Sequence, residues 1–209
     1  MKNYMRSNAK KKVLFVIPRP KIGGDSQVLL NLLQQLDEND TFSYYFLCND
    51  PKGILFDKFG VYGEMLFFPL DRMGWLSTQM QRYPLRLLYK WVKKLYCTYI
   101  ISRINPDIVY INTIRKNESS EAACQWNGKV VVHLHEMDFF VTNLTSTTWI
   151  NQITGRANQL IACAHAVADF YTTIYSVPPE KISILHGPAS NARLSIPDQR
   201  SSGAQKDTI

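Results

Sequence analysis

The stretch that decides the fold is residues 13–36, which read VLFVIPRPKIGGDSQVLLNLLQQL. It opens with the apolar run Val13–Ile17, which indicates a strand buried on both faces, as in a parallel sheet. A loop ending in Gly23–Gly24 follows, and Asp25 and Ser26 are favourable helix N-cap residues. Beyond them, leucines recur at helical spacing. A strand, a loop and a helix in this order predict the start of a βαβ unit.

The rest of the chain repeats this alternation. Further strands are predicted at residues 43–47, 65–68, 107–111, 129–134, 159–163 and 182–185, and further helices at 84–105 and 165–175. The sequence therefore predicts an α/β fold: a single Rossmann-like domain over residues 13–196, with a mainly parallel sheet and helices on both faces. Residues 1–12 are expected to form a basic N-terminal tail, and residues 197–209 a disordered tail or linker stub.

Composition narrows the class of protein. A net charge of +7 and a pI near 9.2 favour an anionic partner, such as a membrane surface, phosphates or nucleic acid. The four cysteines form no CxxC pair and lie mostly in apolar segments, so reduced thiols and a cytoplasmic location are expected. No stretch reaches the roughly 18 to 20 apolar residues that a membrane span needs. The protein is therefore expected to be soluble, or at most peripheral at the inner face of a membrane.

Four segments, in order, resemble the N-terminal domain of retaining glycosyltransferases of family 4, which have the GT-B fold. The resemblance lies in the glycine loop with its flanking strand and helix, a Pro-Asp strand opening, a strand ending in His-Glu, and a segment with a Val-Pro-Pro-Glu-Lys-Ile turn. These segments are Val13–Leu33, Pro106–Asn112, Val131–Glu136 and Ala157–Gly187. The chain departs from the family pattern at Cys163, commonly Ser or Thr, and at His186, commonly Asn.

The resemblance implies transfer of a hexose from a nucleotide sugar to a glycan or lipid-linked acceptor, with retention of anomeric configuration. A GT-B enzyme has two Rossmann-like domains, and this chain resembles only the acceptor-side one, so the donor-binding domain is missing and the chain alone is expected to be inactive or incomplete. The alternative is a non-catalytic acceptor-binding or interaction module that pairs with a separate donor-domain chain. An oxidoreductase is a weaker third interpretation, because the loop is not GxGxxG.

The glycine loop is the first candidate site. Gly23 and Gly24 lack a Cβ, so their backbone N–H groups can approach phosphate or acceptor oxygens closely at a helix N-terminus. An ordinary strand-to-helix turn also favours two glycines, and both interpretations stay open. Arg19 and Lys21 in the same loop are candidates for binding acceptor phosphate, with solvated loop charges as the alternative.

His135 and Glu136 are the candidate catalytic residues. They follow a predicted strand at its carboxyl end, where ligands collect in open α/β sheets. The resemblance implies that His135 hydrogen-bonds the transferred sugar or the acceptor, and that Glu136 orients His135 or contacts the acceptor. The alternative is a structural histidine whose hydrogen bonds are made by the backbone. His133 could pair with His135 on a metal, but no third ligand is visible and the family uses none, so no metal cofactor is expected. Cys163 and His165 are interpreted as structural residues.

The segment 82–103 is basic. Residues 72–106 contain no acidic residue, and Arg86, Lys90 and Lys93 or Lys94 recur at i, i+4 on one face of the predicted helix. Apolar and aromatic residues occupy another face, which favours peripheral contact with an anionic membrane. A core-packed helix with a solvated basic face is the alternative. Nucleic acid is not expected as a partner, because no recognition motif accompanies the charge.

Overall fold

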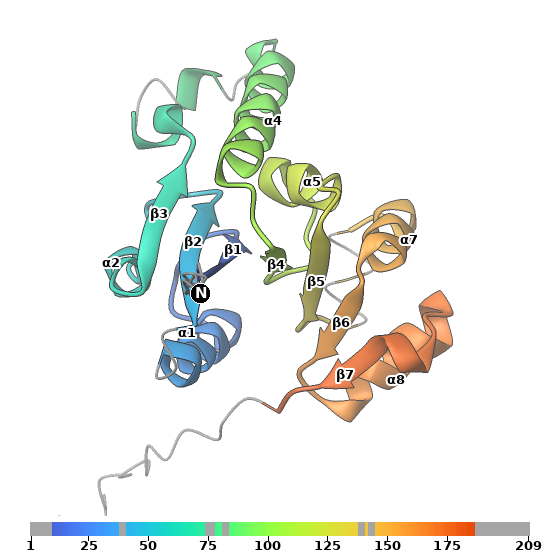
Figure 1. The fold of residues 1–209 in the computed structure, drawn as a ribbon. Coiled ribbons are helices and arrows are strands. Elements are labelled where there is room, and N and C mark those ends of the chain that lie inside the picture. Colours follow the sequence, from blue (N-terminus) through green and yellow to red (C-terminus); the bar gives the residue numbers. More distant parts are fainter. Residues whose placement is uncertain are drawn as a thin grey trace, which may run out of the picture.

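The computed structural model describes residues 10–37, 41–73, 78–80, 84–137, 141 and 145–186. It contains a single sheet whose seven strands are all parallel (Figure 1). The strands are β1 (Lys11–Ile17), β2 (Phe42–Cys48), β3 (Gly63–Phe67), β4 (Ile108–Ile111), β5 (Lys129–Leu134), β6 (Gln159–Ala162) and β7 (Ile182–Ile184). The predicted α/β class and the parallel sheet are confirmed.

The strand order, β3-β2-β1-β4-β5-β6-β7, positions the functional site. The chain builds outward from β1 to β3, then returns to the other side of β1 and builds outward again from β4 to β7. The order therefore reverses between β1 and β4. In open parallel sheets the loops at the carboxyl ends of the two strands beside such a reversal diverge, and the crevice between them is where ligands bind.

Helices cover both faces of the sheet, as predicted (Figure 1). The short helix α2 and α1 pack through Phe59, Leu29 and Leu33 against one face of β1 and β2. Four further α-helices of the described residues pack against the opposite face, which presents Leu14, Val16 and their neighbours. The α-helices are α1 (Gly24–Asp37), α2 (Phe56–Gly60), α4 (Leu85–Ile104), α5 (Glu118–Cys124), α7 (Thr147–Arg156) and α8 (His165–Tyr175), with 3-10 turns η1 (Pro69–Arg72) and η2 (Pro179–Lys181).

The central strands are buried on both faces, which explains their continuous apolar runs. In β1, Phe15 contacts the aromatic residues of one layer while Leu14 and Val16 belong to the other, and all three are almost fully buried. Because alternate residues of a strand point to opposite faces, a strand covered on both sides needs apolar residues at every position.

Helix ends follow recognisable capping chemistry. The helix α4 stops at Asn105, which adopts the left-handed conformation (φ 50°) before Pro106, so the predicted end of this helix is confirmed. The helix α5 begins at Asn117, whose side chain accepts from the Ser120 amide in a reciprocal capping box. Neither α5 nor α7 was predicted, since one is short and serine-rich and the other has few apolar residues.

The terminal predictions fall largely outside the described residues. Lys11 and Lys12, assigned to the basic tail, belong to β1 and pair with Phe42 and Ser43. Residues 197–209 are not described. All four cysteines are free thiols, and three of them are buried. Among the described helices, none combines the length and the hydropathy required to cross a bilayer.

Candidate functional site

Three loops meet at the reversal of strand order. They follow the carboxyl ends of β1, β4 and β5, and contain Gly23–Gly24, Asn112–Thr113 and His135–Glu136 respectively. The Asn112 amide continues the ladder by donating to the Val16 carbonyl, 3.0 Å away. The Trp149 indole N–H of α7 donates to the Ile114 carbonyl at 2.8 Å, which fixes the loop after β4 from below. The sheet thus holds all three loops at one edge.

Asn112 joins the loops by hydrogen bonds. Its Nδ2 donates to the carbonyl of Asp25 at 3.3 Å, and its Oδ1 lies 3.2 Å from Nε2 of His135. The structure therefore brings His135 to the first turn of α1, next to the glycine pair. Asn112 was not singled out by sequence reasoning, although its position directly after a buried strand was a usable signal.

The protonation of His135 follows from this geometry. Because Asn112 Oδ1 can only accept, Nε2 of His135 carries the proton, and Nδ1 keeps a lone pair for a ligand hydroxyl. Burial lowers the pKa of His135, against a smaller opposite effect of the Glu136 and Asp25 carboxylates. The ring is therefore neutral at pH 7.

His133 lies beneath His135, with ring centroids 3.9 Å apart. It is fully buried, and its Nδ1 is 2.7 Å from the Tyr110 hydroxyl. Its Nε2 has no hydrogen-bond partner among the described residues. Burial, and secondarily the repulsion that a protonated His135 would exert, lowers the pKa of His133 to about 3. His133 is thus a neutral support for the His135 ring.

Glu136 connects two of the loops. Its Oε1 accepts from the Thr113 hydroxyl at 2.9 Å, and its Oε2 from the His135 amide at 3.3 Å. The Tyr171 hydroxyl of α8 donates to its backbone carbonyl. With both carboxylate oxygens engaged, Glu136 is placed to hold the loop that carries His135.

The two glycines differ in their surroundings. A Cβ at Gly24 would meet no atom within 4 Å, whereas one at Gly23 would lie 2.9 Å from the Asp25 carboxylate. Neither glycine has a positive φ. Internal packing therefore does not require a glycine at position 24, and the space beside its backbone is open to a ligand.

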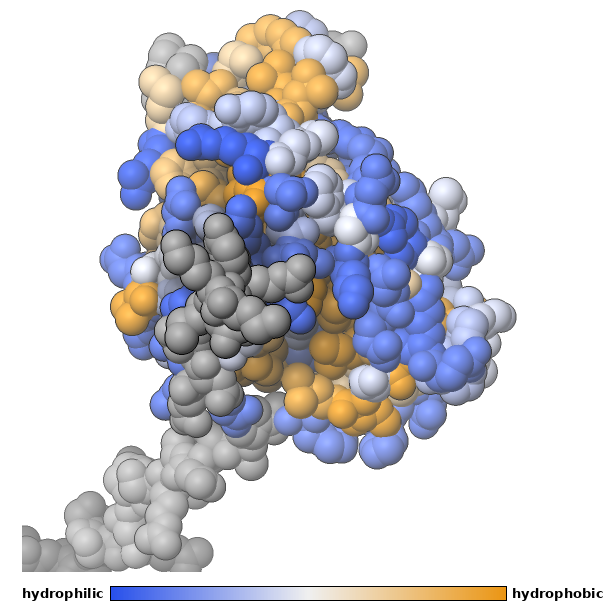
Figure 2. Space-filling model, viewed as in Figure 1, coloured by the Kyte–Doolittle hydropathy of each residue, from blue (hydrophilic) through white to orange (hydrophobic). Residues whose placement is uncertain are grey.

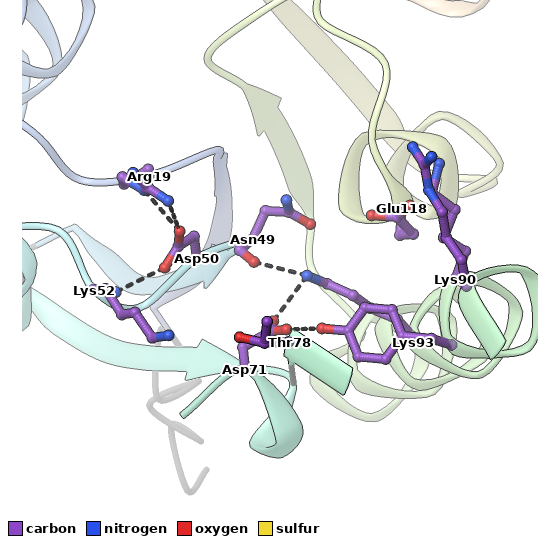
Figure 3. A pocket seen from close by; sticks show the side chains of 11 residues that line it. Arg19, Asn49, Asp50, Lys52, Asp71, Thr78, Lys90, Lys93 and Glu118 are labelled. Carbon is purple, nitrogen blue, oxygen red and sulfur yellow. Dashed lines mark hydrogen bonds and ion pairs between the residues drawn. The ribbon is translucent and has the colours of Figure 1, made fainter. Parts of the chain in front are cut away.

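Arg19 and Lys21 do not join His135. Arg19 donates through Nε to Asp50 Oδ2 at 2.7 Å, in an ion pair that turns it towards the loop after β2 (Figure 3). Burial raises the pKa of Asp50, but the Lys52 amide and the Arg19 guanidinium more than offset this and hold that pKa below its usual range. Lys21 is exposed and does not line the pocket that contains Arg19.

That pocket, of about 440 Å³, lies between the carboxyl ends of β1 and β2 and the N-terminal half of α4. At its base Lys93 and Asp71, both buried, form an ion pair of 2.8 Å, and the Tyr89 hydroxyl donates to the same carboxylate (Figure 3). Lys93 also donates to the Asn49 carbonyl at 2.7 Å. Sequence reasoning placed Lys93 or Lys94 on an exposed basic face, towards a membrane or solvent, because the sequence gave no sign that Lys93 pairs with Asp71, 22 positions earlier.

No group of three metal-ligating side chains occurs within the part of the chain that the structure describes. His133 and His135 stack, and their nitrogens face Tyr110 and Asn112. The expectation that the site uses no metal stays a prediction.

Comparisons with known proteins agree with this architecture. The structure of a UDP-N-acetylglucosamine 2-epimerase is similar with a TM-score of 0.61 and 13% identity, over 84% of this chain and 48% of that one. A glycosyltransferase from Rickettsia africae is similar with a TM-score of 0.53 and 16% identity, over 85% of this chain and 43% of that one. Anabaena HepE, solved with UDP and glucose, is similar with a TM-score of 0.55 and 15% identity, over 85% of this chain and 44% of that one. The chain spans less than half of each of these structures. No curated protein sequence matches it.

The family match is specific. Residues 22–190, most of the chain, match the family model of Glycosyltransferase Family 4, and this segment contains the glycine pair, Asn112 and the His135 loop. Its sheet and helices form the Rossmann-like fold of the N-terminal half of GT-B proteins. The chain therefore belongs to glycosyltransferase family 4.

Proposed function

We propose that this domain forms the acceptor side of an enzyme that transfers a hexose from a nucleotide sugar to a glycan or lipid-linked acceptor, with retention of anomeric configuration. Membership of the family supports glycosyl transfer in general. The observation that carries the more specific proposal is the neutral His135 ring, held by Asn112 at the reversal of strand order beside the open backbone of Gly24.

The side chains of this edge divide into two roles. Nδ1 of His135 accepts a hydrogen bond from a hydroxyl of the transferred sugar and orients it. Asn112 fixes the ring through Nε2, and Glu136 fixes the loop, so both are positioning residues. The backbone N–H groups at the start of α1 meet ligand oxygens. The carboxylate of Asp25 beside them favours hydroxyl oxygens over phosphate at this point.

The donor is bound mainly by a second domain. The similar structures are about twice as long as this chain, and HepE was solved with UDP and glucose. A GT-B donor site lies between two Rossmann-like domains, so a donor-binding domain, in the same polypeptide or in a partner chain, completes the crevice. The nucleotide sugar is a substrate, and neither a metal nor another cofactor is part of the proposal.

The exposed face of α4 supports contact with an anionic membrane through residues 82–103. Leu87, Trp91 and Tyr99 are 71%, 60% and 60% exposed, an unusual exposure for large apolar side chains. Figure 2 shows the apolar surface that gathers at the end of the molecule where Figure 1 places α4. Arg82 lies outside the described residues. With free thiols throughout, the protein works at the cytoplasmic face.

The test is a transfer assay on this domain together with its donor-binding domain. Release of UDP from UDP-glucose and UDP-N-acetylglucosamine is followed with a panel of glycan and lipid-linked acceptors, and NMR reads the anomeric coupling of the product. An α-linked product from an α-linked donor is expected. An inverted product rejects retention. Acceptor binding without turnover in the complete assembly selects the alternative, a non-catalytic acceptor-binding module.

A further inference from the structure

The pocket between β1, β2 and α4 carries an excess of positive charge. Its lining includes five cations and three carboxylates, a net charge of +2. The cations are Arg19, Lys52, Arg86, Lys90 and Lys93. They come from the loop after β1, the loop after β2 and the helix α4, so positive charge surrounds the cavity and is not confined to one wall (Figure 3).

Two of these cations already have carboxylate partners. Arg19 pairs with Asp50, and Lys93 pairs with the buried Asp71. The bonds from Lys93 to Asn49 and from Tyr89 to Asp71 tie α4 to the loop after β2 and to η1. The polar groups at the base of the pocket therefore hydrogen-bond to one another, and they hold this part of the pocket in place.

The other three cations are available. No carboxylate is paired with Lys52, Arg86 or Lys90 among the residues that the structure describes. Arg86 and Lys90 are four positions apart on α4, so their side chains share one helix face. Like charges around one cavity repel each other, and a bound anion with several oxygens relieves that repulsion.

We propose that this pocket binds a phosphate group of the acceptor, with Arg86 and Lys90 on one wall and Lys52 on the other. The inference rests on the proposed function for the identity of the ligand as an acceptor. A phosphate ester fits the lining better than a sugar alone, because a guanidinium binds two phosphate oxygens at once and an ammonium binds a third.

The position of the pocket agrees with an acceptor subsite. Glu118, which lines it, starts α5 immediately after the β4 loop that contains Asn112, and Arg19 lies in the β1 loop that ends at the glycine pair. The pocket and the His135 crevice therefore share the β1 loop, and the pocket borders the helix that follows the β4 loop. A ligand whose phosphate occupies the pocket extends its sugar or alcohol along these loops towards His135.

Two sources of acceptor phosphate share this chemistry: the headgroup of a lipid-linked acceptor and a soluble phosphorylated sugar. Two exposed apolar residues of α4 directly follow the pocket cations, since Leu87 follows Arg86 and Trp91 follows Lys90, so an apolar stripe runs beside the cationic one on this helix. A headgroup at a bilayer surface would therefore enter the pocket directly from the membrane face of the same helix.

The test measures binding to the full chain and needs no turnover. Glycerol 3-phosphate is titrated by calorimetry or by NMR, with glycerol as the uncharged probe. The double variant R86Q/K90Q should lose at least about tenfold in affinity, since charge-assisted hydrogen bonds are removed. The matched control R103Q/K129Q removes two exposed positive charges outside the pocket and should change affinity less than about twofold, a screened surface effect.

Vesicles of phosphatidylcholine with and without phosphatidic acid separate the two sources. If R86Q/K90Q loses vesicle binding together with glycerol 3-phosphate binding, the phosphate belongs to a lipid headgroup. If it loses only glycerol 3-phosphate binding, the ligand is soluble. Equal affinity of the wild type and R86Q/K90Q for glycerol 3-phosphate, or no binding by the wild type, overturns the proposal. Because no reaction is read out, phosphate binding without sugar transfer in the complete assembly would refute the proposed function. The phosphate site would then stand, but its ligand would not be an acceptor.

Discussion

The crevice at His135 and the pocket beside α4 lie at the same edge of the sheet but differ in electrostatic character. The crevice presents neutral hydrogen-bonding groups, a histidine pair whose pKa values are lowered and an asparagine that joins three loops, with the carboxylates of Glu136 and Asp25 beside them. The pocket is lined by charges, with a buried ion pair at its base and three cations that pair with no carboxylate of the described part of the chain. Neutral hydrogen-bonding groups suit sugar hydroxyls, and cations suit an anion, which is the division that the proposed phosphorylated acceptor requires.

The largest effect is expected for Asp71→Ala, which tests whether the pocket floor depends on its ion pair. The substitution leaves Lys93 buried without a carboxylate, which should lower the free energy of unfolding by about 3–5 kcal/mol. Urea unfolding measures this. The control Asp71→Leu/Lys93→Met removes both charges and should recover most of the loss. A cost below about 1 kcal/mol for Asp71→Ala would contradict the buried pair.

Acidification should destabilise the crevice through its histidines. The pKa of His133 is about 3 in the folded protein and near 6.5 in the unfolded chain, so between these pH values the unfolded chain binds the proton more readily. The free energy of unfolding is therefore unaffected by the titration of this histidine above pH 6.5 and falls by about 1.4 kcal/mol per pH unit below it. By pH 5 the protein should have lost about 2 kcal/mol of stability. The lowered pKa of His135 acts in the same direction.

Unfolding free energies at a series of pH values measure this dependence. The variant His133→Asn cannot titrate in this range and should flatten the slope. A wild-type protein whose stability is constant from pH 7 to pH 5 would show that His133 is not buried as described.

Gly24→Ala separates an open ligand surface from an ordinary turn. Because a Cβ meets no atom there, the variant should be as stable as the wild type or up to about 1 kcal/mol more stable. If ligand oxygens approach this backbone, transfer activity should fall about tenfold, which is about 1.4 kcal/mol of binding in the transition state. Gly155→Ala, at another helical glycine with open space, is the matched control and should keep full activity. Unchanged activity in Gly24→Ala removes the glycine pair from the site.

The smallest loss of stability is expected for Lys94→Ala, at the position next to the buried Lys93. Lys94 forms a 3.0 Å ion pair with Glu121 at the partly exposed surface, where such a pair contributes about 0.2–1 kcal/mol. Thermal unfolding of Lys94→Ala measures it. We expect Lys94→Ala to lower the free energy of unfolding far less than Asp71→Ala does, because only the ion pair of Lys93 is buried. A similar loss of stability in both variants would contradict this difference.

Much of the fold could be predicted from local signals. Strands such as Val13–Ile17 are continuous apolar runs because both of their faces are covered, and the end of α4 is marked by Asn105–Pro106. The helix α7 was missed because its ten residues, TTWINQITGR, include few apolar ones. The buried side of this helix consists of Trp149, Ile150, Ile153 and Thr154, and its three apolar residues span little more than one turn, which is too short to reveal a period.

The candidate site could be predicted only where it coincides with strand ends. His135 and Glu136 follow β5 and Gly24 begins α1, and these segments meet at the edge where the sheet topology places them. The partners of Arg19 and Lys93 lie 31 and 22 positions away in sequence, so neither ion pair leaves a local pattern. Long-range pairing of charges, which decides which cations remain available for a ligand, required the structure.

The most direct measurement for the proposed role of the crevice is the kinetics of His135→Ala in the complete enzyme, with the unfolding free energy measured in parallel. If the imidazole orients the sugar as proposed, kcat should fall by about 100-fold, or 2.7 kcal/mol, while stability stays within about 1 kcal/mol of the wild type. Wild-type turnover by this variant, with sugar transfer otherwise intact, would show that His135 does not meet the substrate.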